Sequence, residues 1–261
     1  MILFYKYQGA GNDFIVVDNR AGQMEDLSAA FISNLCHRRF GIGGDGLMLL
    51  QTHPDYDFQM VYYNANGLEG SMCGNGGRCI VAFAQFLGII EDNTSFLAVD
   101  GPHEAFIPTT DYVELKMGAV SDIQLSEAYC YLDTGSPHYV EFVPEIVDVD
   151  VIGRGRAIRY NETYREKGVN VNFVEIEGPD RLLVATYERG VEDETLACGT
   201  GVTAAALAYF LQHTEKPNGK HCVYISVKGG KLEVRFNYED NEFSNIWLCG
   251  PAMQVFVGTI H

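Results

Sequence analysis

The chain has 261 residues, and its 18 basic against 35 acidic side chains give a formal net charge of −17 at pH 7. Hydrophobic residues make up 47% of the sequence and charged residues 20%, which excludes a disordered tail and a fibrous repeat. This balance, with a pI near 4.7, offers no basic stripe for a phosphate backbone, so we expect no nucleic acid partner.

Residue periodicity predicts many short strands and few helices. In chain order, the predicted elements are a helix over 27–37, a strand over 58–63, a helix over 76–87, a strand over 112–117, a helix over 158–166, strands over 169–176 and 182–187, a helix over 200–212, and strands over 223–227 and 231–236. Because helices do not alternate with every pair of strands, the pattern disfavours a parallel, doubly wound sheet.

The predicted helices over 76–87 and 200–212 are apolar on nearly every side, which is typical of buried helices. The most apolar stretch, 79–90, has 12 residues, whereas a membrane span needs about 20. The first residues also lack the pattern of a signal peptide. We therefore expect a soluble, cytoplasmic protein without a membrane partner, in which both helices are buried.

The chain has seven cysteines, an odd number in a sequence long enough to need no disulfide framework. They are Cys36, Cys73, Cys79, Cys130, Cys198, Cys222 and Cys249. No two of them have CxxC spacing, and no Cys/His cluster has the spacing of a zinc site. We expect reduced thiols and no metal centre.

An internal repeat relates two parts of the chain. Cys73-Gly-Asn-Gly and Cys198-Gly-Thr-Gly each come just before one of the apolar helices, and the two cysteines are 125 residues apart. Other landmarks recur at almost the same offset, namely Gly11 and Gly135, Asp45 and Asn170, and Tyr62 and Tyr187.

The repeat predicts two pseudo-symmetric halves, residues 1–118 carrying Cys73 and residues 119–261 carrying Cys198. Since each half has many strands and one fully apolar helix, we expect an α+β fold in which a mixed sheet, or roll, is wrapped around a buried central helix.

Each repeated cysteine is predicted to stand at the N-terminus of a buried helix. The first N–H groups of a helix have no intrahelical acceptor and carry about half a positive charge, so they stabilise both a thiolate and a bound anion. A lone cysteine in this position is more often a small core residue than a reactive one. The duplication favours chemistry instead, because two such thiols can flank one substrate if a two-fold axis brings the helix ends to one cleft.

Two thiols on opposite sides of a carboxylate meet the needs of a two-base racemase or epimerase. One thiolate removes the α-proton, the opposite thiol donates a proton to the other face, and the helix N-termini hold the carboxylate as charge develops on it. This chemistry needs no cofactor. The segment Gly41-Ile-Gly-Gly-Asp-Gly46 fits a dinucleotide motif, but it lacks the preceding strand and the following helix that such a site requires.

Four motifs carry a family resemblance: Gly9-Ala-Gly-Asn-Asp-Phe-Ile-Val-Val-Asp, Cys73-Gly-Asn-Gly-Gly-Arg-Cys, Tyr187-Glu-Arg-Gly and Ala197-Cys-Gly-Thr-Gly. On these motifs the chain resembles the diaminopimelate epimerases, from about Phe4 to its last residues. The resemblance implies a pyridoxal-independent interconversion of LL- and meso-2,6-diaminoheptanedioate in lysine and peptidoglycan biosynthesis. It also implies a small-molecule substrate, and a homodimer is left open.

The resemblance assigns a role to individual residues of this chain. Cys73 and Cys198 are the two acid/base thiols. Backbone N–H groups that donate to the α-carboxylate are assigned to Gly74, Asn75, Gly199 and Thr200, and substrate-binding side-chain amides to Asn12, Asn64 and Asn170. Arg189 is assigned as the partner of the distal carboxylate and Glu188 as the acceptor for an ammonium group. His138 is assigned as a supporting histidine.

Two positions depart from the family pattern. Ser136 stands where many members have asparagine, so one amide contact becomes a shorter hydroxyl, and Gly46 stands where some members have glutamine.

Two other functions stay open at this point. A racemase of another amino acid, such as proline, would use the same thiols but leave Arg189 and Glu188 unpaired, at a large energetic cost. A non-catalytic protein that binds small anions would use the helix ends alone as a carboxylate clamp.

Overall fold

The computed structural model describes residues 1–24, 27–70 and 72–260. The chain divides into two compact units, Met1–Leu115 with Gly250–His261 (unit 1) and Lys116–Cys249 (unit 2). The sequence-based division after residue 118 therefore differs from these units mainly in residues 250–261. These residues belong to unit 1 because their strand pairs with the first strand of the chain.

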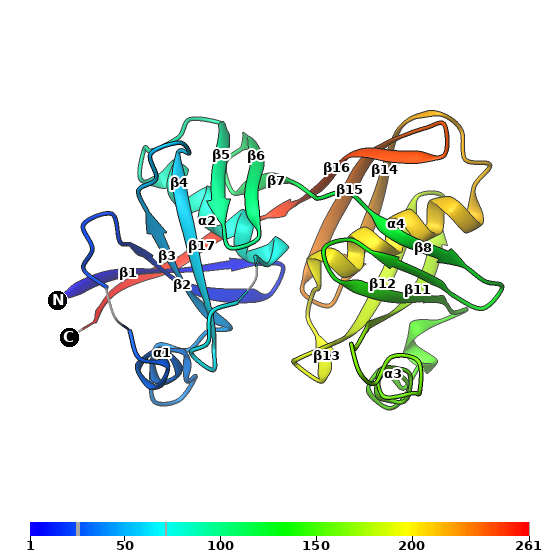
Figure 1. The fold of residues 1–261 in the computed structure, drawn as a ribbon, viewed down its shortest axis with the longest axis horizontal. Helices are drawn as coiled ribbons and strands as arrows, with labels where there is room; N and C mark the ends of the chain where they lie inside the picture. Colours follow the sequence, from blue (N-terminus) through cyan, green and yellow to red (C-terminus); the bar gives the residue numbers. More distant parts are fainter. Residues whose placement is uncertain (25–26, 71, 261) are drawn as a thin grey trace. The chain divides into compact units, whose positions relative to one another are not determined.

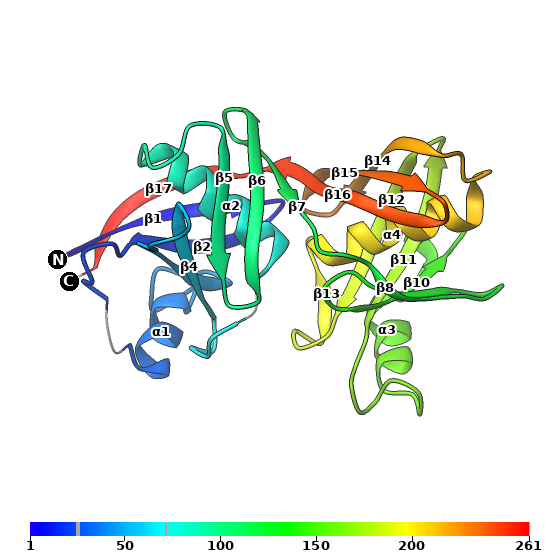
Figure 2. The same ribbon diagram turned by 45° about the horizontal axis from the view of Figure 1, so that its top comes forward.

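Unit 1 is built mostly of strands. Its elements are β1 (Ile2–Gly9), β2 (Asn12–Asp18), α1 (Ala29–Cys36), β3 (Gly46–Gln51), β4 (Phe58–Asn64), α2 (Gly74–Phe86), β5 (Asn93–Ala98), β6 (Gly101–Thr109), β7 (Tyr112–Lys116) and β17 (Met253–Ile260). Strands β1 and β17 run side by side, so both ends of the chain lie at one end of this unit (Figures 1 and 2).

Unit 2 has the same mixture of elements. They are β8 (Ser121–Leu125), β9 (Cys130–Asp133), β10 (Pro137–Phe142), the 3₁₀ turn η1 (Ile146–Asp148), α3 (Val151–Arg159), β11 (Asn170–Gly178), β12 (Arg181–Glu188), β13 (Asp193–Thr195), α4 (Gly199–His213), β14 (Gly219–Val227), β15 (Gly230–Glu239) and β16 (Glu242–Pro251). The expected duplication is thus visible as two sets of matching elements.

Strand pairing follows one pattern in both units. Unit 1 has the order β17-β1-β2-β3-β4-β5-β6-β7, in which β2 with β3 and β4 with β5 are parallel and the other pairs antiparallel. Unit 2 has the order β8-β9-β10-β11-β12-β14-β15-β16, with parallel pairs at the same two places. Even the register is repeated, because Phe14 lies opposite Gly46 and Tyr139 opposite Val171, 125 residues later.

The central strands of unit 1 are buried on both faces. Along β2 and β3, side chains point alternately toward α2 and toward α1, as the two-residue period of a strand requires. Phe14 and Met48 belong to the cluster around α2, whereas Ile15 and Leu47 belong to the cluster around α1. This two-sided burial explains the nearly continuous apolar runs in these strands.

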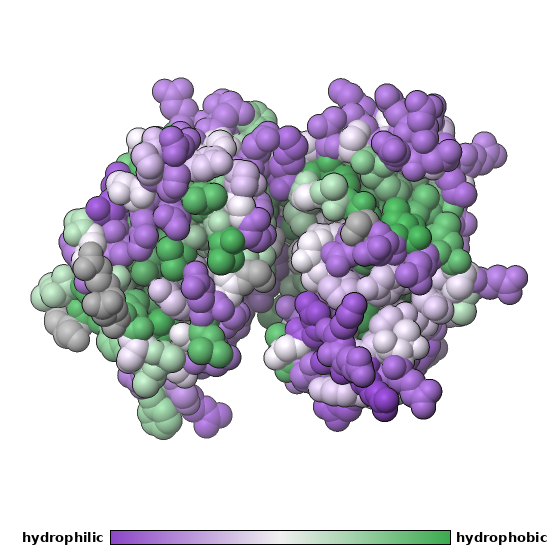
Figure 3. Space-filling model, viewed as in Figure 1, coloured by the Kyte–Doolittle hydropathy of each residue, from purple (hydrophilic) through white to green (hydrophobic). Residues whose placement is uncertain are grey.

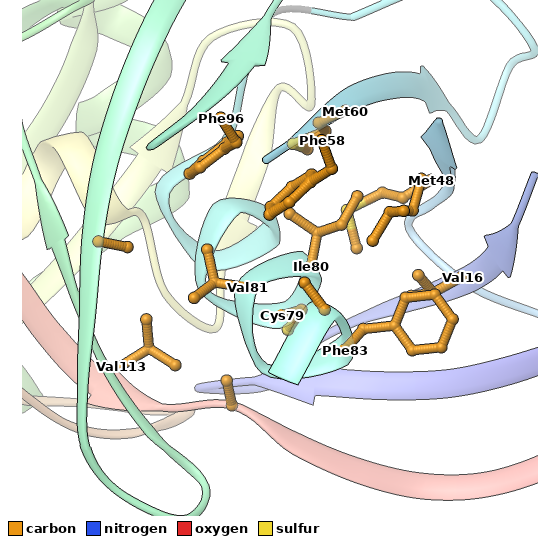
Figure 4. Close-up of a cluster of buried hydrophobic side chains, with 14 of the residues drawn as sticks. Val16, Met48, Phe58, Met60, Cys79, Ile80, Val81, Phe83, Phe96 and Val113 are labelled. Atoms are coloured by element: carbon orange, nitrogen blue, oxygen red, sulfur yellow. The ribbon is translucent and has the colours of Figure 1, made fainter. Parts of the chain in front are cut away.

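Helix α2 lies among the strands of unit 1, as the apolar pattern predicted (Figure 1). Its side chains Ile80, Val81 and Phe83 are fully buried and meet strand residues such as Phe58 and Phe96 (Figure 4). Each such side chain removed from water contributes about 1.5–3 kcal/mol to folding. Figure 3 shows hydrophilic and hydrophobic residues mixed over the visible surface of each unit.

Helix α4 is buried along nearly its whole length in unit 2. Its residues from Val202 to Ala208 have no exposed surface, and four of them are alanines. Small side chains let the surrounding strands approach the helix axis closely. Among the described residues, no helix is long and apolar enough to cross a membrane.

The predicted helix over 158–166 is wrong in position. The structure has α3 at Val151–Arg159, where the Asp150 side chain caps the helix by accepting from the Gly153 N–H at 2.9 Å. Two glycines make this segment a poor helix by propensity, but Gly155 is required because a Cβ there would lie 2.4 Å from the Cβ of Tyr187. After the helix, the Asn161 side chain accepts from two backbone N–H groups and forms a turn instead.

Candidate active site

Both repeated cysteines stand at the N-cap position of the buried helix of their unit. Cys73 precedes α2 and Cys198 precedes α4, each with extended backbone angles. Sulfur is a weaker acceptor than the oxygen of the usual capping residues, so it competes poorly for the N–H groups of the first helical turn. Those N–H groups and the positive end of the helix dipole therefore suit an anion in both units.

In unit 1, the first turn of α2 is tied into a chain of polar side chains. Asn75 is fully buried, and its Oδ1 accepts from Arg78 Nη2 at 2.9 Å while its Nδ2 donates to Asn12 Oδ1. Asn12 Nδ2 in turn donates to Asp45 Oδ2 at 2.9 Å. The chain runs from a buried cation to a carboxylate, so it fixes which way both amides point.

A cluster of charges holds the Asp45 end of this chain. Arg38 contacts both Asp13 and Asp45, at 2.6 and 2.7 Å, and the buried Lys6 contacts Asp13 at 2.6 Å. Burial alone would raise the pKa of Asp13, but hydrogen bonds from Arg38 and Lys6 outweigh it and hold this pKa below its usual 3.8. The start of β2, and with it Asn12, is therefore anchored by ion pairs.

Asn64 closes β4 in unit 1 and is exposed there. The chain turns directly after it, with Gly67 at a φ of +85° and hydrogen bonds from Asn64 N to Leu68 O and from Gly67 N to Asn64 O. A Cβ on Gly70 would lie 2.6 Å from Asn64 Nδ2, so glycine is needed beside this amide.

The glycine at position 46 also has a steric cause. A Cβ there would lie 2.4 Å from Cε2 of the Tyr62 ring and 2.5 Å from the carbonyl oxygen of Tyr63. This chain therefore has no room for a longer side chain at that position, and the Tyr62 ring occupies the adjoining space.

In unit 2, Cys198 lies beside a hydroxyl. Cys198 is 8% exposed, and its Sγ is 3.5 Å from Thr200 Oγ1 in the first turn of α4. The same turn carries Gly201, at which a Cβ would lie 2.5 Å from Asn172 Oδ1 and 3.3 Å from the Cys198 sulfur. Glycine at 201 thus allows the helix end to approach both groups.

His138 is fully buried behind this helix end. Its Nδ1 lies 3.1 Å from Asn172 Nδ2, and its Nε2 lies 3.0 Å from Ser136 Oγ. Burial, together with the positive charge of Arg189, lowers the pKa of His138 to about 3. The imidazole is therefore neutral at physiological pH.

Ser136 connects several of the predicted site residues. Its Oγ lies 3.1 Å from Thr200 Oγ1 and accepts from Asn170 Nδ2 at 3.2 Å. Asn170 is almost fully buried, and its Oδ1 accepts from the backbone N–H of Arg189 at 2.9 Å. The departure from asparagine at 136 thus replaces an amide by a hydroxyl with three polar neighbours.

Glu188 is the last residue of β12 and Arg189 follows it, and both are half-buried. The Arg189 Nη1 donates to Lys167 O at 2.9 Å. Gly168, at a φ of +76°, makes room for this stem, because a Cβ there would lie 2.5 Å from Arg189 Cδ. The carbonyl oxygen of Lys167 thus holds the guanidinium beside the end of the strand.

The sequence profile of the family described as "Diaminopimelate epimerase" matches residues 4–121 and 130–255. The chain belongs to the diaminopimelate epimerase family. A relative from Flavobacterium psychrophilum with that name is 50% identical over 256 residues, 98% of this chain and 99% of the relative. One from Chlorobaculum tepidum, also named diaminopimelate epimerase, is 45% identical over 260 residues, 97% and 98% of the two chains.

Solved structures outside the family share the fold of this diaminopimelate epimerase family member. A phenazine biosynthesis protein of the PhzF family from Bacillus anthracis matches with a TM-score of 0.77 at 13% identity, over 100% of this chain and 99% of that one. A probable proline racemase from Agrobacterium radiobacter K84 matches with a TM-score of 0.68 at 14% identity, over 100% and 93%. At such low identity these matches show the fold alone.

Within each unit, the structure brings together most of the site residues expected from the resemblance. Unit 1 joins Asn12, Asn75 and the helix start at Cys73, and unit 2 joins Ser136, His138, Asn170, Thr200 and Cys198. Asn64, Glu188 and Arg189 each lie at a strand end of their unit.

Sequence reasoning missed four residues that hold these groups in place, namely Asp45, Arg78, Asn172 and Thr186. Asn170 and Asn172 alternate in one apolar strand, and this pattern could have indicated two buried amides on one face. For Arg78 the sequence indicates the wrong location, because arginine is almost never fully buried unless it is paired.

Proposed function

We propose that the protein epimerises LL-2,6-diaminoheptanedioate to the meso isomer without a cofactor, as an isomerase of lysine and peptidoglycan biosynthesis. The observation that carries this proposal is the duplicated cysteine at the N-cap of a buried helix, Cys73 in unit 1 and Cys198 in unit 2. Family membership over nearly the whole chain supports the choice of substrate.

In this mechanism one sulfur is a thiolate and the other a thiol. The thiolate takes the proton from the α-carbon, and the electron pair of the broken C–H bond moves into the α-carboxylate. The opposite thiol then gives its proton to the other face of the same carbon, so the two cysteines exchange protonation states. Because the two ionisations are coupled, they titrate as a pair and not as separate groups.

The helix ends supply the stabilisation. Backbone N–H groups of Gly74 and Asn75, and of Gly199 and Thr200, hold the α-carboxylate while negative charge builds up on it. These donors are fixed before the reaction, so they cost no reorganisation when the charge develops. Removal of a single donor of this type typically slows an enzyme by about 100- to 1,000-fold.

Specificity for a substrate with two amino-acid ends falls to the remaining polar residues. Arg189 pairs with the distal carboxylate, Glu188 accepts from an ammonium group, and the amides of Asn12, Asn64 and Asn170 complete the contacts. A smaller amino acid such as proline has no distal carboxylate or distal ammonium group to pair with Arg189 and Glu188, which disfavours it as the substrate.

We also infer a cytoplasmic location, where thiols stay reduced, and a homodimer. The dimer is supported by apolar side chains on β17, of which Val255 is 56% and Val257 50% exposed. Light scattering that gives a mass near 29.0 kDa in place of twice that value would refute the dimer.

The test of the reaction is deuterium incorporation at the α-carbon of diaminopimelate in deuterated, reducing buffer. We expect incorporation with the unaltered protein and a loss of at least about 100-fold in epimerisation for Cys73→Ala and for Cys198→Ala. Proline is the matched control substrate. No incorporation into diaminopimelate refutes the proposal, and incorporation into proline instead identifies a racemase of another amino acid.

A further inference from the structure

Cys198 is reached by a chain of hydrogen bonds that starts at a buried amide and has only one consistent direction. We propose that Ser136 and His138 are positioning residues, which hold the Thr200 hydroxyl hydrogen on the Cys198 sulfur and so stabilise its thiolate. The inference rests on the proposed function, in which Cys198 is one of the two acid/base thiols. It assigns a task to the serine that departs from the family pattern.

The direction of the chain is set at Asn172. Its Nδ2 faces the carbonyl oxygen of Tyr139 at 3.0 Å, and its Oδ1 accepts from the Thr186 hydroxyl at 2.9 Å. A carbonyl oxygen has no hydrogen to donate, so the amide cannot be flipped without losing that hydrogen bond. The NH₂ group of Asn172 therefore also faces His138 Nδ1, at 3.1 Å.

The histidine transmits this direction to Ser136. Its Nδ1 accepts from Asn172, and because the ring is neutral, its single N–H must be on Nε2. Nε2 lies 3.0 Å from Ser136 Oγ and donates to it. Burial keeps the ring neutral, so this tautomer persists through the physiological pH range.

Ser136 receives a second donor. Asn170 Nδ2 points at Ser136 Oγ and at the carbonyl oxygen of Pro137, both at 3.2 Å, and Asn170 Oδ1 accepts from the Arg189 N–H. With two donors directed at its oxygen, the hydroxyl of Ser136 has its own hydrogen left to give to Thr200 Oγ1, at 3.1 Å. A hydroxyl can accept and donate at one atom, whereas an amide divides these roles between two atoms.

Thr200 completes the chain. Its Oγ1 accepts from Ser136, so its own hydrogen is directed at Cys198 Sγ, 3.5 Å away. The first turn of α4 is held by a further hydrogen bond, in which the buried Thr134 Oγ1 donates to Thr200 O at 2.9 Å. A hydrogen bond to a charged acceptor is worth about 1.5–3 kcal/mol, which corresponds to at least about tenfold in the thiolate equilibrium.

The experiment compares alkylation of Cys198 with alkylation of Cys73 in the same molecules. Iodoacetamide reacts with thiolates, and mass spectrometry of the two peptides gives both rates at a pH of about 6, below the usual thiol pKa. We expect Thr200→Val, which keeps the shape and removes the hydroxyl, to slow the Cys198 rate about tenfold. Thr200→Ser retains the hydroxyl and should stay within about threefold of the unaltered protein.

Two further pairs test the positioning residues themselves. Ser136→Ala and His138→Leu should each slow the Cys198 rate by about three- to tenfold, whereas His138→Gln restores an N–H toward Ser136 and should recover most of it. The direction of the change in the Cys198 alkylation rate distinguishes a positioning role from a purely structural one. A purely structural role predicts faster alkylation in Ser136→Ala, because the smaller side chain opens the site to the reagent.

An unchanged or faster Cys198 rate in Thr200→Val and Ser136→Ala overturns the inference, as does a parallel change at Cys73. Alkylation requires no turnover, so this result is independent of the deuterium test. Deuterium incorporation together with unaltered alkylation refutes only the hydrogen-bond chain. Absence of incorporation refutes the proposed function, whatever the alkylation rates are.

Discussion

Unit 1 has Asp13, Asp45 and Arg78 at positions where unit 2, 125 residues later, has His138, Asn170 and Thr203. The surrounding strands pair in the same order and, between β2 and β3 and between β10 and β11, in the same register. The backbone framework is therefore repeated while the charges on it are not.

The two hydrogen-bond chains also end differently. In unit 1 the chain passes from Arg78 through Asn75 and Asn12 to the carboxylate of Asp45. In unit 2 it passes only through neutral side chains, from Asn172 through His138, Ser136 and Thr200, to the sulfur of Cys198. The same backbone framework thus holds one helix start with buried charge and the other with directed neutral hydrogen bonds, and we expect the two arrangements to differ in their contribution to stability and in their response to pH.

The largest difference is expected at the paired positions Arg78 and Thr203. Both side chains bond back to the carbonyl four residues earlier, Arg78 Nη1 to Gly74 O at 3.2 Å and Thr203 Oγ1 to Gly199 O at 3.0 Å. Arg78→Met also removes the charged hydrogen bond from Arg78 to the buried Asn75 Oδ1, so we expect a loss of about 3 kcal/mol in unfolding free energy, against about 1 kcal/mol for Thr203→Val.

Urea unfolding of the two variants measures both losses of unfolding free energy. The comparison requires that the unfolding free energy depend on urea concentration with the same slope in each variant. Equal losses would mean that the charge at 78 adds nothing beyond its hydrogen bond to the helix.

The second-largest difference between the units is expected in how their stability depends on pH. The folded pKa of His138 is lowered from 6.5 to about 3, so below pH 6.5 the unfolded chain takes up a proton that the folded chain excludes. The stability linked to His138 is therefore complete above pH 6.5. Below that pH it decreases by about 1.4 kcal/mol per pH unit, so that about 2 kcal/mol has been lost at pH 5. The Asp13 pKa is also lowered, so its contribution persists down to pH 3.8 and is lost only below that.

Fluorescence of Trp247, the single tryptophan and a residue of unit 2, follows the unfolding of that unit in acid. His138→Gln should flatten the pH dependence between 6.5 and about 4. A slope that survives in this variant would place the titrating group elsewhere.

The smallest contrast concerns the equivalent glycines Gly76 and Gly201. A Cβ at Gly201 would lie 2.5 Å from Asn172 Oδ1, which the Thr186 hydroxyl holds in place, whereas one at Gly76 would lie 3.4 Å from the flexible end of Met48. We expect Gly201→Ala to cost about 1 kcal/mol and Gly76→Ala to be neutral or stabilising by about 0.5 kcal/mol, because alanine favours a helix. Thermal unfolding of the two variants checks this, and a cost at Gly76 equal to that at Gly201 would contradict it.

Local patterns explain what the sequence predicted well. The two buried helices, the strands around them and the cysteine at each helix start were predicted because apolar periodicity and the repeated Cys-Gly-x-Gly motif involve residues close together in the chain. The helix at 151–159 was misplaced because its two glycines lower the helix propensity of this segment. The need for Gly155 depends on Tyr187, which is distant in the sequence.

The contacts of the supporting residues were beyond sequence reasoning for a related reason. Asn172 faces Thr186 only because of the register between β11 and β12, and Asp45 meets Asn12 only because β2 and β3 run parallel. A hydrogen-bond direction, such as the one from His138 to Thr200, needs both the partners and their distances.

The pairing of β17 with β1 has a consequence for the order in which the protein can be made. Unit 2 is one continuous stretch, and its outermost strand β8 is made before the neighbour with which it pairs. Unit 1 has β17 in the equivalent place, and this strand is synthesised after all of unit 2. On the ribosome, unit 2 can therefore complete its sheet first, while β1 keeps an open edge until residues 253–260 emerge.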